Sequence, residues 1–331
     1  MIRHRGIPHN AIMLYIKGNR RALLLVVAAA VGLCASAAPA VMSDGDAPAD
    51  SRRITFEMTY NLSPRGSNCN ASLVTLLPQT IQNRQTIHSI SYTLEPQEVF
   101  QRNGNTYARF EVSNACADVQ LVISVDAEIH RYDLETAQRI KPGSPLPPEN
   151  LAQYLRRERY IETDAGDIKS AARLARGESQ IAVIQALFQQ VLSRLTYSGF
   201  QSRELGALGA WRLMKGDCTE YTDLLIALLR ARGIPARAVS GLITNFSDVP
   251  HHNWVEVYMK NLGWVPLDPL HAAMRTATFE QLRPIYIYLS TMRNDSVLGG
   301  FAIWTCRMTG SGMDVNASLR LTDKIPTNIS Y

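Results

Sequence analysis

The stretch from Lys215 to Leu270 decides the fold. It reads KGDCTEYTDLLIALLRARGIPARAVSGLI over residues 215–243 and, after a polar loop, HNWVEVYMKNLGWVPLDPL over residues 252–270. Cys218, His252 and Asp268 follow one another in it, each at the edge of a strongly patterned segment. A thiol, a base and a carboxylate that orients the base are the groups that a cysteine nucleophile requires. The stretch therefore predicts a Cys–His–Asp triad.

The first half of the stretch predicts a buried helix that begins at Cys218 and ends before Gly233. Its apolar face comprises Tyr221, Leu224, Leu225, Leu228 and Leu229. Unpaired N–H groups and the positive dipole end at a helix start favour a thiolate and can bind an oxyanion. Gly216 allows a close turn before the thiol, and Asp217 can cap the helix. Taken alone, Cys218 would be interpreted as a small buried packing residue.

The second half predicts antiparallel strands that bring the other two residues together. Residues 236–243 are typical of a buried strand, residues 254–259 alternate, and residues 262–265 return after a turn. His252 stands at the beginning of one strand and Asp268 at the end of the next, so the two side chains can meet. We expect His252 to act as base and later as acid, with Asp268 fixing its tautomer.

Two other histidines allow rival assignments. His251 would point to the opposite face from His252 in an extended chain, and His271 follows the strand rather than lying in it. A zinc site made of Cys218, His251, His252 and Asp268 is an alternative, but no CxxC or HxxxH spacing supports it. We expect no metal and no cofactor.

Four side chains near the predicted triad complete these expectations. Asp223 and Glu256 are interpreted as a helix-face and a strand-face charge. Trp254 and Asp217 are the candidates for lining a substrate cleft.

The quoted residues resemble the transglutaminase-like superfamily of papain-type cysteine enzymes, in particular its exported bacterial members. The three matching blocks are GDCTEY with its helix and strand, HNWVEVY, and GWVPLDP, and weaker similarity extends from about Tyr154 to Leu289. The resemblance implies that Cys218 is the nucleophile, His252 the base and Asp268 the orienting acid.

Two further implications of the resemblance concern single residues. The residue after the histidine is usually small in the family, whereas here it is Asn253. An aromatic or amide side chain upstream of the cysteine often assists the oxyanion, and Tyr197 is the candidate for that role.

The amino terminus has the layout of a signal peptide over residues 1–37. A basic lead is followed by the apolar run ALLLVVAAAVGLC over residues 22–34 and by small residues. The run is short for a membrane span, although an uncleaved anchor is the alternative. We therefore expect an exported protein, periplasmic or secreted, with a flexible linker over residues 38–51.

The net charge of +5 belongs to this leading segment. Five of the 34 Lys and Arg residues lie in it, which leaves 29 basic and 29 acidic residues in the remainder. The remainder carries no basic excess that would indicate a nucleic-acid partner.

Residues 52–145 predict a β-sandwich domain. Short alternating segments are separated by turn signals such as Asn103-Gly104. In an oxidising compartment Cys69 and Cys116 are the candidate disulfide. Cys306 is then the odd thiol, and we interpret it as buried and inert.

Residues 146–331 predict the catalytic domain, giving an α+β protein with helices packed on an antiparallel sheet. Helical spacing predicts helices from about 163 to 176, from 178 onward, and over 205–214. A hairpin over residues 301–321 is expected to complete the sheet around the site.

The expected reaction is acyl transfer from an amide or peptide bond through a thioester at Cys218. Transfer to water would make the protein a peptidase or amidase, which we favour, and transfer to an amine would make it a transglutaminase. The partner is then a protein or peptide substrate. A binding or scaffold protein that lost the activity is the other alternative, and the intact triad argues against it.

Overall fold

The computed structural model describes residues 50–140, 150–200, 203–245, 250–300 and 302–322. Asp50–Tyr331 forms one compact unit. The predicted signal peptide, the predicted linker except its last two residues, and the turn-rich boundary near residue 145 lie outside the described residues. No helix within these ranges has the length and apolar character needed to cross a membrane.

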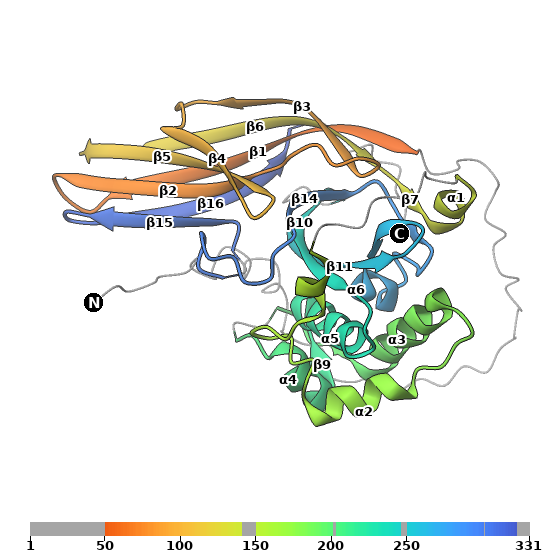
Figure 1. Ribbon diagram of the computed structural model, residues 1–331. Helices are drawn as coiled ribbons and strands as arrows, with labels where there is room; N and C mark the ends of the chain where they lie inside the picture. The colour runs from red at the N-terminus through yellow and green to blue at the C-terminus, as the bar shows by residue number, and fades with distance from the viewer. Residues whose placement is uncertain (1–49, 141–149, 201–202, 246–249, 301, 323–331) are drawn as a thin grey trace, which may run out of the picture. The chain divides into compact units, whose positions relative to one another are not determined.

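The first part of the fold consists of two packed sheets that form a β-sandwich, as the alternating sequence predicts (Figure 1). Its two antiparallel sheets have the strand orders β16-β1-β6-β3 and β15-β2-β5-β4. Every second residue of β1 from Ile54 to Leu62 is at most 1% exposed, because one face of each strand points between the sheets. The strands are β1 Ser51–Pro64, β2 Cys69–Leu77, β3 Gln85–Tyr92, β4 Glu98–Arg102, β5 Asn105–Ala115, β6 Val119–His130, β15 Trp304–Thr309 and β16 Met313–Leu321.

The carboxy-terminal hairpin β15–β16 belongs to this sandwich, so its predicted place in the sheet around the site is wrong. β16 pairs with β1, with Met58 opposite Leu319, and β15 pairs with β2, with Leu73 opposite Cys306. The hairpin thereby covers the outer edges of β1 and β2, which would otherwise expose unpaired backbone groups. Alternation predicted the strands correctly but carries no information about which sheet they join.

The predicted turn at Asn103-Gly104 is confirmed. Both residues have positive φ angles, 52° and 80°, as a two-residue hairpin of this type requires.

The predicted disulfide is absent, because Cys69 and Cys116 are both free thiols. The Cys69 thiol is buried and donates to the carbonyls of Gly66 and Gly312, whereas Cys116 is exposed. Cys306 lies in β15 as expected and is partly rather than fully buried; burial raises its pKa to about 11.

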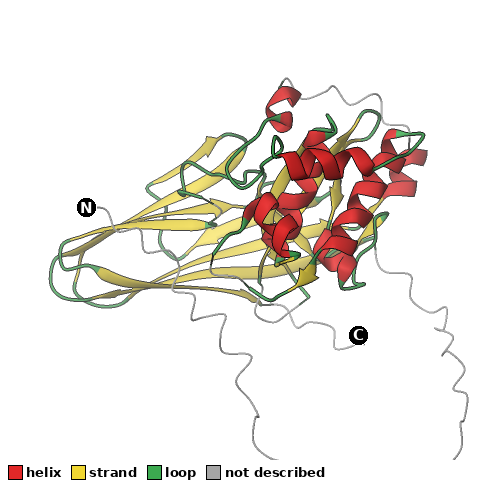
Figure 2. Ribbon diagram, turned by 90° about the horizontal axis from the view of Figure 1, so that it is seen from below, coloured by secondary structure: helices red, strands yellow, loops and turns green. Residues whose placement is uncertain are grey.

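The second part of the fold is a four-stranded antiparallel sheet with helices on one face (Figure 2). The strand order is β12-β11-β10-β14. Its strands are β10 Ala236–Ile243, β11 His251–Met259, β12 Gly263–Leu267 and β14 Tyr286–Ser290, and the principal helices are α2 Gly166–Leu174, α3 Gln180–Arg194, α4 Gly206–Leu213, α5 Cys218–Ala231 and α6 Pro269–Ala273. The shorter elements are β7 Tyr132–Asp133, α1 Leu134–Arg139, the 3-10 helix η3 Leu151–Leu155, β8 Thr196–Tyr197, β9 Lys215–Gly216 and β13 Gln281–Leu282.

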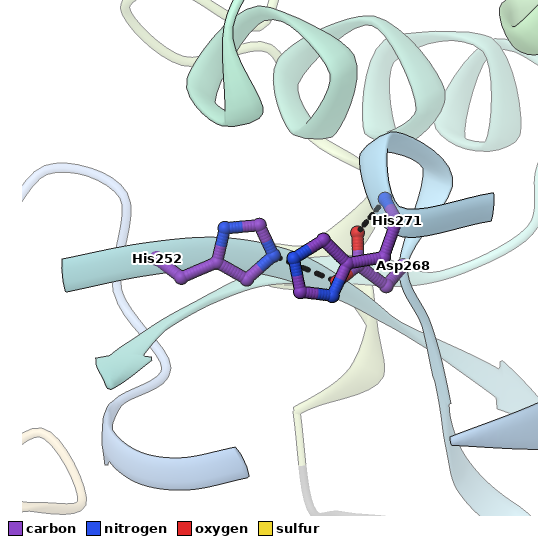
Figure 3. Close-up of side chains that lie close together, drawn as sticks. All are labelled: His252, Asp268 and His271. Atoms are coloured by element: carbon purple, nitrogen blue, oxygen red, sulfur yellow. Dashed lines mark hydrogen bonds and ion pairs between the residues drawn. The ribbon is translucent and has the colours of Figure 1, made fainter. Parts of the chain in front are cut away.

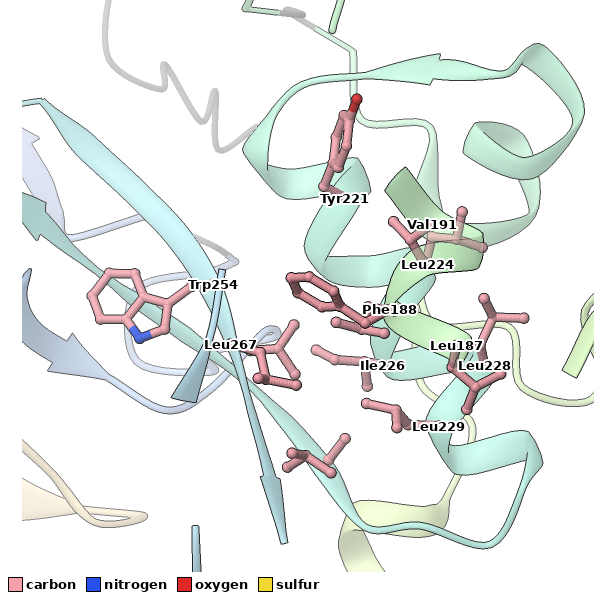
Figure 4. Close-up of a cluster of buried hydrophobic side chains, with 14 of the residues drawn as sticks. Leu187, Phe188, Val191, Tyr221, Leu224, Ile226, Leu228, Leu229, Trp254 and Leu267 are labelled. Carbon is pink, nitrogen blue, oxygen red and sulfur yellow. The ribbon is translucent and has the colours of Figure 1, made fainter. Parts of the chain in front are cut away.

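Helix α5 lies at the centre of the second core. Leu224, Leu228 and Leu229 are fully buried against side chains of α3 and of the sheet (Figure 4). The helix ends at the predicted place, since Gly233 adopts a left-handed conformation with φ 74°.

The sheet separates two hydrophobic clusters. Tyr286 and Tyr288 of β14 belong to the cluster with the helices, whereas Ile287 and Leu289 belong to the cluster with the sandwich. This alternation follows from the two-residue period of a strand. Successive residues of β14 therefore pack alternately against the helical core and against the sandwich.

A side chain of the sandwich fixes the register of β14. The Gln85 amide accepts from the Tyr288 backbone N–H at 2.7 Å and donates to the Tyr288 carbonyl at 3.0 Å. One amide thus supplies both hydrogen bonds that a further strand would make. Because β14 is an edge strand of its sheet, this contact determines where its two tyrosines lie.

Candidate active site

Cys218 is the first residue of α5, as predicted. Asp217 is the N-cap, and its carboxylate accepts from the Thr219 N–H at 2.8 Å. Glu220 accepts in return from the Asp217 N–H at 3.0 Å, which completes a capping box. A Cβ at Gly216 would lie 2.3 Å from the Cβ of Glu220, so the turn before the thiol requires glycine. The sequence fits this turn at each position.

Glu220 is almost completely buried beneath the cysteine. Burial and the charge of Asp217 raise its pKa to about 7. The Leu205 N–H also donates to its carboxylate, at 3.0 Å. The side chain therefore ties the turn to the start of α4 and has a structural role.

His252 and Asp268 meet as the strand pairing predicts. Val255 of β11 lies opposite Leu267 of β12, which brings the start of one strand beside the end of the other. The imidazole Nε2 of His252 lies 2.7 Å from Oδ2 of Asp268. Both side chains are buried, and Asp268 is 0% exposed. The carboxylate therefore fixes the ring through one nitrogen and leaves the other for the thiol.

The electrostatics of the pair favour a charged imidazole. Burial disfavours that charge, but the carboxylate of Asp268 and the hydrogen bond with Cys218 outweigh it and raise the pKa of His252 to about 10. Burial likewise opposes the charge on Asp268, but the neighbouring histidines outweigh it and lower its pKa to about 2. Near neutral pH the arrangement is an imidazolium held between the Asp268 carboxylate and the Cys218 sulfur.

His271 and Tyr286 surround the far side of the carboxylate, a feature that sequence reasoning missed. Asp268 is the N-cap of α6, and its Oδ1 accepts from the His271 N–H at 2.9 Å. The Tyr286 hydroxyl donates to Oδ2 at 2.8 Å. The rings of His252 and His271 stack with centroids 4.5 Å apart (Figure 3). The pairing of Asp and Pro at a helix start is a signal that could have located His271.

The same atoms form a group that could hold a metal ion. The ligand atoms of His252, Asp268 and His271 all lie within 4.8 Å of one another. Both imidazoles already contact Oδ2 of Asp268, His252 at 2.7 Å and His271 at 3.2 Å. The cluster thus has a complete arrangement of protein partners, and it is a different set from the zinc ligands considered from the sequence.

Several sequence expectations need correction. Trp254 is 0% exposed and packs edge-on against Tyr286 and Tyr288, so it belongs to the core rather than to a cleft. Asp217 caps α5 and is 6% exposed. His251 lies away from the triad, with Nε2 2.6 Å from the Ser240 hydroxyl, and burial lowers its pKa to about 4.

Asp223 and Glu256 are not surface charges, because both are buried in ion pairs. Arg293 donates two hydrogen bonds to Asp223, at 2.7 and 3.0 Å. Arg237 donates two to Glu256, at 2.9 and 2.6 Å. The sequence could not show the Asp223 pair, since Arg293 lies far along the chain from the helix that it binds.

Tyr197 and Asn253 both lie near the thiol. Tyr197 is half exposed on β8, opposite Gly216 of β9, and burial together with the charges of Cys218 and Asp217 raises its pKa. The Asn253 amide donates to the Thr219 hydroxyl at 3.0 Å and lies 3.8 Å from the Cys218 sulfur. The residue that departs from the family pattern therefore contacts the cysteine.

Comparison with known proteins places this geometry in a class. Residues 168–269 match the transglutaminase-like superfamily. The range includes Cys218, His252 and Asp268. This part of the chain is therefore a transglutaminase-like core.

Individual relatives extend the likeness beyond the core. An uncharacterised protein of Haemophilus influenzae is 24% identical over 296 residues, covering 76% of this chain and 78% of that protein. The uncharacterised protein YebA of Bacillus subtilis is 32% identical over 78 residues, which is 19% of this chain and 11% of YebA. A crystal structure from Cytophaga hutchinsonii, of a protein proposed to be a cysteine protease, has a TM-score of 0.56 at 15% identity. That match covers 85% of this chain and 96% of that one, so the sandwich and the core together follow a known fold.

Proposed function

We propose that the protein is a cysteine-dependent enzyme that cleaves amide or peptide bonds through a thioester at Cys218. The proposal rests on one observation: the His252 imidazole lies between Cys218, in the first turn of α5, and Asp268. A hydrogen bond with Cys218 and a 2.7 Å contact with Asp268 occupy the imidazole. This is the arrangement of nucleophile, base and orienting acid that covalent catalysis needs.

The mechanism follows from the charges. The Cys218 thiolate attacks the carbonyl carbon, and the electron pair of the carbonyl moves to its oxygen. The carbon–nitrogen bond then breaks, and His252 gives its proton to the leaving amine, so that a thioester and a neutral imidazole remain. Water attacks the thioester while His252 takes a proton from it, and the acid product leaves with the thiolate–imidazolium pair restored.

The start of α5 supplies groups for the oxyanion. Asp217 accepts from the Thr219 N–H, whereas the Cys218 N–H has no acceptor among the described residues. A backbone donor at a helix start stabilises negative charge that develops beside the nucleophile. Tyr197, whose pKa is raised by burial and by the charge of Cys218, is the side chain that we propose as a second donor.

Hydrolysis is the proposed outcome, and amine transfer is the second candidate. Both use the same thioester and differ only in the acceptor. Water is the acceptor available wherever the protein works, which favours hydrolysis. A silent scaffold remains the third candidate, and the buried charges of the triad support activity instead, because such charges are costly to retain without use.

Alkylation with iodoacetamide tests the thiol first. At about pH 6 an ordinary thiol is almost wholly protonated, so Cys218 should react at least tenfold faster than the exposed Cys116 of the same molecule. His252→Ala should remove the difference. Mass spectrometry of the labelled peptides measures both cysteines in one sample. Equal rates at Cys218 and Cys116 would contradict the proposal.

Incubation of the protein with a mixture of peptides and a primary amine then identifies the acceptor of the acyl group. Shortened peptides would indicate hydrolysis, and products heavier by the amine would indicate transfer. Cys218→Ser is the control that should abolish either product. Rapid alkylation of Cys218 without formation of either peptide product would support the candidate function of a silent scaffold.

We also propose that the protein is exported, which rests on the basic lead and apolar run of residues 1–37. Cell fractionation with amino-terminal sequencing tests it. Recovery outside the cytoplasm with the leader removed is the expected result, and recovery in the cytoplasm with the leader intact would contradict it.

A further inference from the structure

The carboxylate of Asp268 receives more donors than a triad needs. His252 contacts Oδ2 at 2.7 Å, and the Tyr286 hydroxyl donates to the same oxygen at 2.8 Å. His271 contributes its backbone N–H to Oδ1 at 2.9 Å, while its Nδ1 lies 2.8 Å from the Tyr286 hydroxyl. Tyr286 and His271 both lie beyond residue 269, where the family match ends.

The direction of these hydrogen bonds is determined by the chemistry. The Tyr286 hydroxyl has one hydrogen, which it donates to Asp268, so its oxygen must accept from His271. Nδ1 of His271 therefore carries the proton. Burial lowers the pKa of His271 to about 4, so the ring is neutral and can stack on the charged ring of His252. This proton on Nδ1 faces both neighbours, because Nδ1 lies 2.8 Å from the Tyr286 hydroxyl and 3.2 Å from Oδ2 of Asp268 itself.

We propose that Tyr286 and His271 are positioning residues that share the Asp268 carboxylate with His252 and thereby weaken its hold on the imidazolium proton. The inference rests on the proposed function, because it assigns these residues a part in the same reaction. Their part is separate from the chemistry at the thiol, since within the described ranges neither side chain hydrogen-bonds to Cys218.

The reaction gives a reason for such sharing. A buried aspartate whose only donor is an imidazolium holds that proton strongly, because little else reduces its charge. His252 must nevertheless give the proton to the leaving amine, and a proton held too strongly slows that step. A hydroxyl that donates to the same oxygen takes up part of the negative charge. A donor behind Tyr286 strengthens that effect, because hydrogen bonds in a chain polarise one another.

Strand β14 offers a matched control. Tyr286 and Tyr288 lie two residues apart on one face, and both pack edge-on against Trp254, at 5.1 and 4.9 Å. The Gln85 amide holds the strand at the backbone of Tyr288. Only the Tyr286 hydroxyl reaches Asp268. Removing each hydroxyl in turn therefore separates a role on the carboxylate from a role in packing.

The test follows the ionisation of His252 by nuclear magnetic resonance of its ring protons across the pH range. Tyr286→Phe should move the midpoint of the His252 titration upward by about half a pH unit or more, the scale of losing one hydrogen bond to a charged group. The maximal rate of acyl transfer should fall by about tenfold with KM unchanged. Tyr288→Phe should leave the midpoint where it is in the unaltered protein.

Two substitutions of His271 keep the test valid if Tyr286→Phe fails to fold. His271→Asn retains an N–H donor near the position of Nδ1, and His271→Phe retains a stacked ring without a donor. The midpoint should stay near its original value in His271→Asn and rise in His271→Phe. The reverse order would overturn the proposal, because stacking rather than donation would then control the ring.

The outcomes separate this inference from the proposed function. If Cys218 is rapidly alkylated but the His252 midpoint does not rise in Tyr286→Phe, or falls, the role of Tyr286 and His271 is refuted and the enzyme remains. If the midpoint rises while Cys218 reacts as slowly as Cys116, the positioning stands and the proposed enzyme fails.

Discussion

Two aspartates of the helical core are equally buried but have different surroundings. Asp223 of α5 and Asp268 after β12 are both 0% exposed. Asp223 faces the guanidinium of Arg293, which donates two hydrogen bonds to it. Asp268 faces two imidazoles, which can change their protonation, and the hydroxyl of Tyr286. Burial of a charge therefore does not distinguish Asp268, for which we propose a function, from Asp223, whereas the nature of the partners does.

The shifts in pKa express the same difference. Burial raises the pKa of Asp223 to about 7 in spite of Arg293, whereas the histidines around Asp268 lower its pKa to about 2 against the effect of burial. Arg293 also contacts Glu204, at 3.1 Å, and covers the ring of Tyr160 at 4.5 Å. The Asp223 region joins a helix to a loop with a permanent charge. The Asp268 region holds a charge whose partners can move a proton.

The largest expected effect is on reactivity, from replacing each aspartate by its amide. Asp268→Asn should slow acyl transfer by about 10⁴-fold, as for other triad aspartates, because a neutral amide no longer stabilises the imidazolium. Alkylation of Cys218 at about pH 6 should fall to the rate of Cys116. Asp223→Asn is the matched control and should leave that alkylation rate unchanged. Loss of Cys218 reactivity in both variants would remove the distinction between the two regions.

The next effect is on stability, and it reverses the order of the two regions. Arg293→Met leaves the Asp223 carboxylate buried without its partner, which should lower the free energy of unfolding by about 3–5 kcal/mol. Urea denaturation measures this change. The double variant Asp223→Leu with Arg293→Met should recover much of the loss, since apolar pairs often replace buried ion pairs well. Equal stability of single and double variants would mean that the carboxylate is not the cause.

Periodicity made most of the elements around these aspartates predictable. Helix α5 and strand β10 were found because an apolar face at helical spacing and a continuous buried run are local signals. The meeting of His252 with Asp268 also followed, because it depends only on two neighbouring strands being antiparallel. Local pattern was sufficient wherever contacting residues lie in adjacent elements.

Contacts between distant segments could not be predicted in this way. The alternation of residues 313–321 is equally compatible with either sheet, and only the pairing with β1 decides between them. Tyr286 lies in a strand that was expected, but its contact with Asp268 depends on how β14 lies beside β10. The sequence does not predict that His271 lies in the site, because this residue follows the strand. His271 lies in the site because Asp268 caps the start of α6 and accepts from the His271 N–H.

The smallest expected effect is on the pH dependence of stability between about pH 7 and 10, which should belong to the Asp268 region. The pKa of His252 rises from 6.5 to about 10 on folding, so its contribution is complete below about pH 6.5 and is lost as the pH rises toward 10. The pKa of Asp268 falls from 3.8 to about 2, so its contribution is present above about pH 4 and is lost toward pH 2. Between about pH 7 and 10 the free energy of unfolding should therefore fall by about 1–3 kcal/mol more in the unaltered protein than in Asp268→Asn. The double variant Asp223→Leu with Arg293→Met, which has no carboxylate at that position, should retain the slope of the unaltered protein. Parallel curves for the unaltered protein and Asp268→Asn would show that the imidazolium does not depend on this carboxylate.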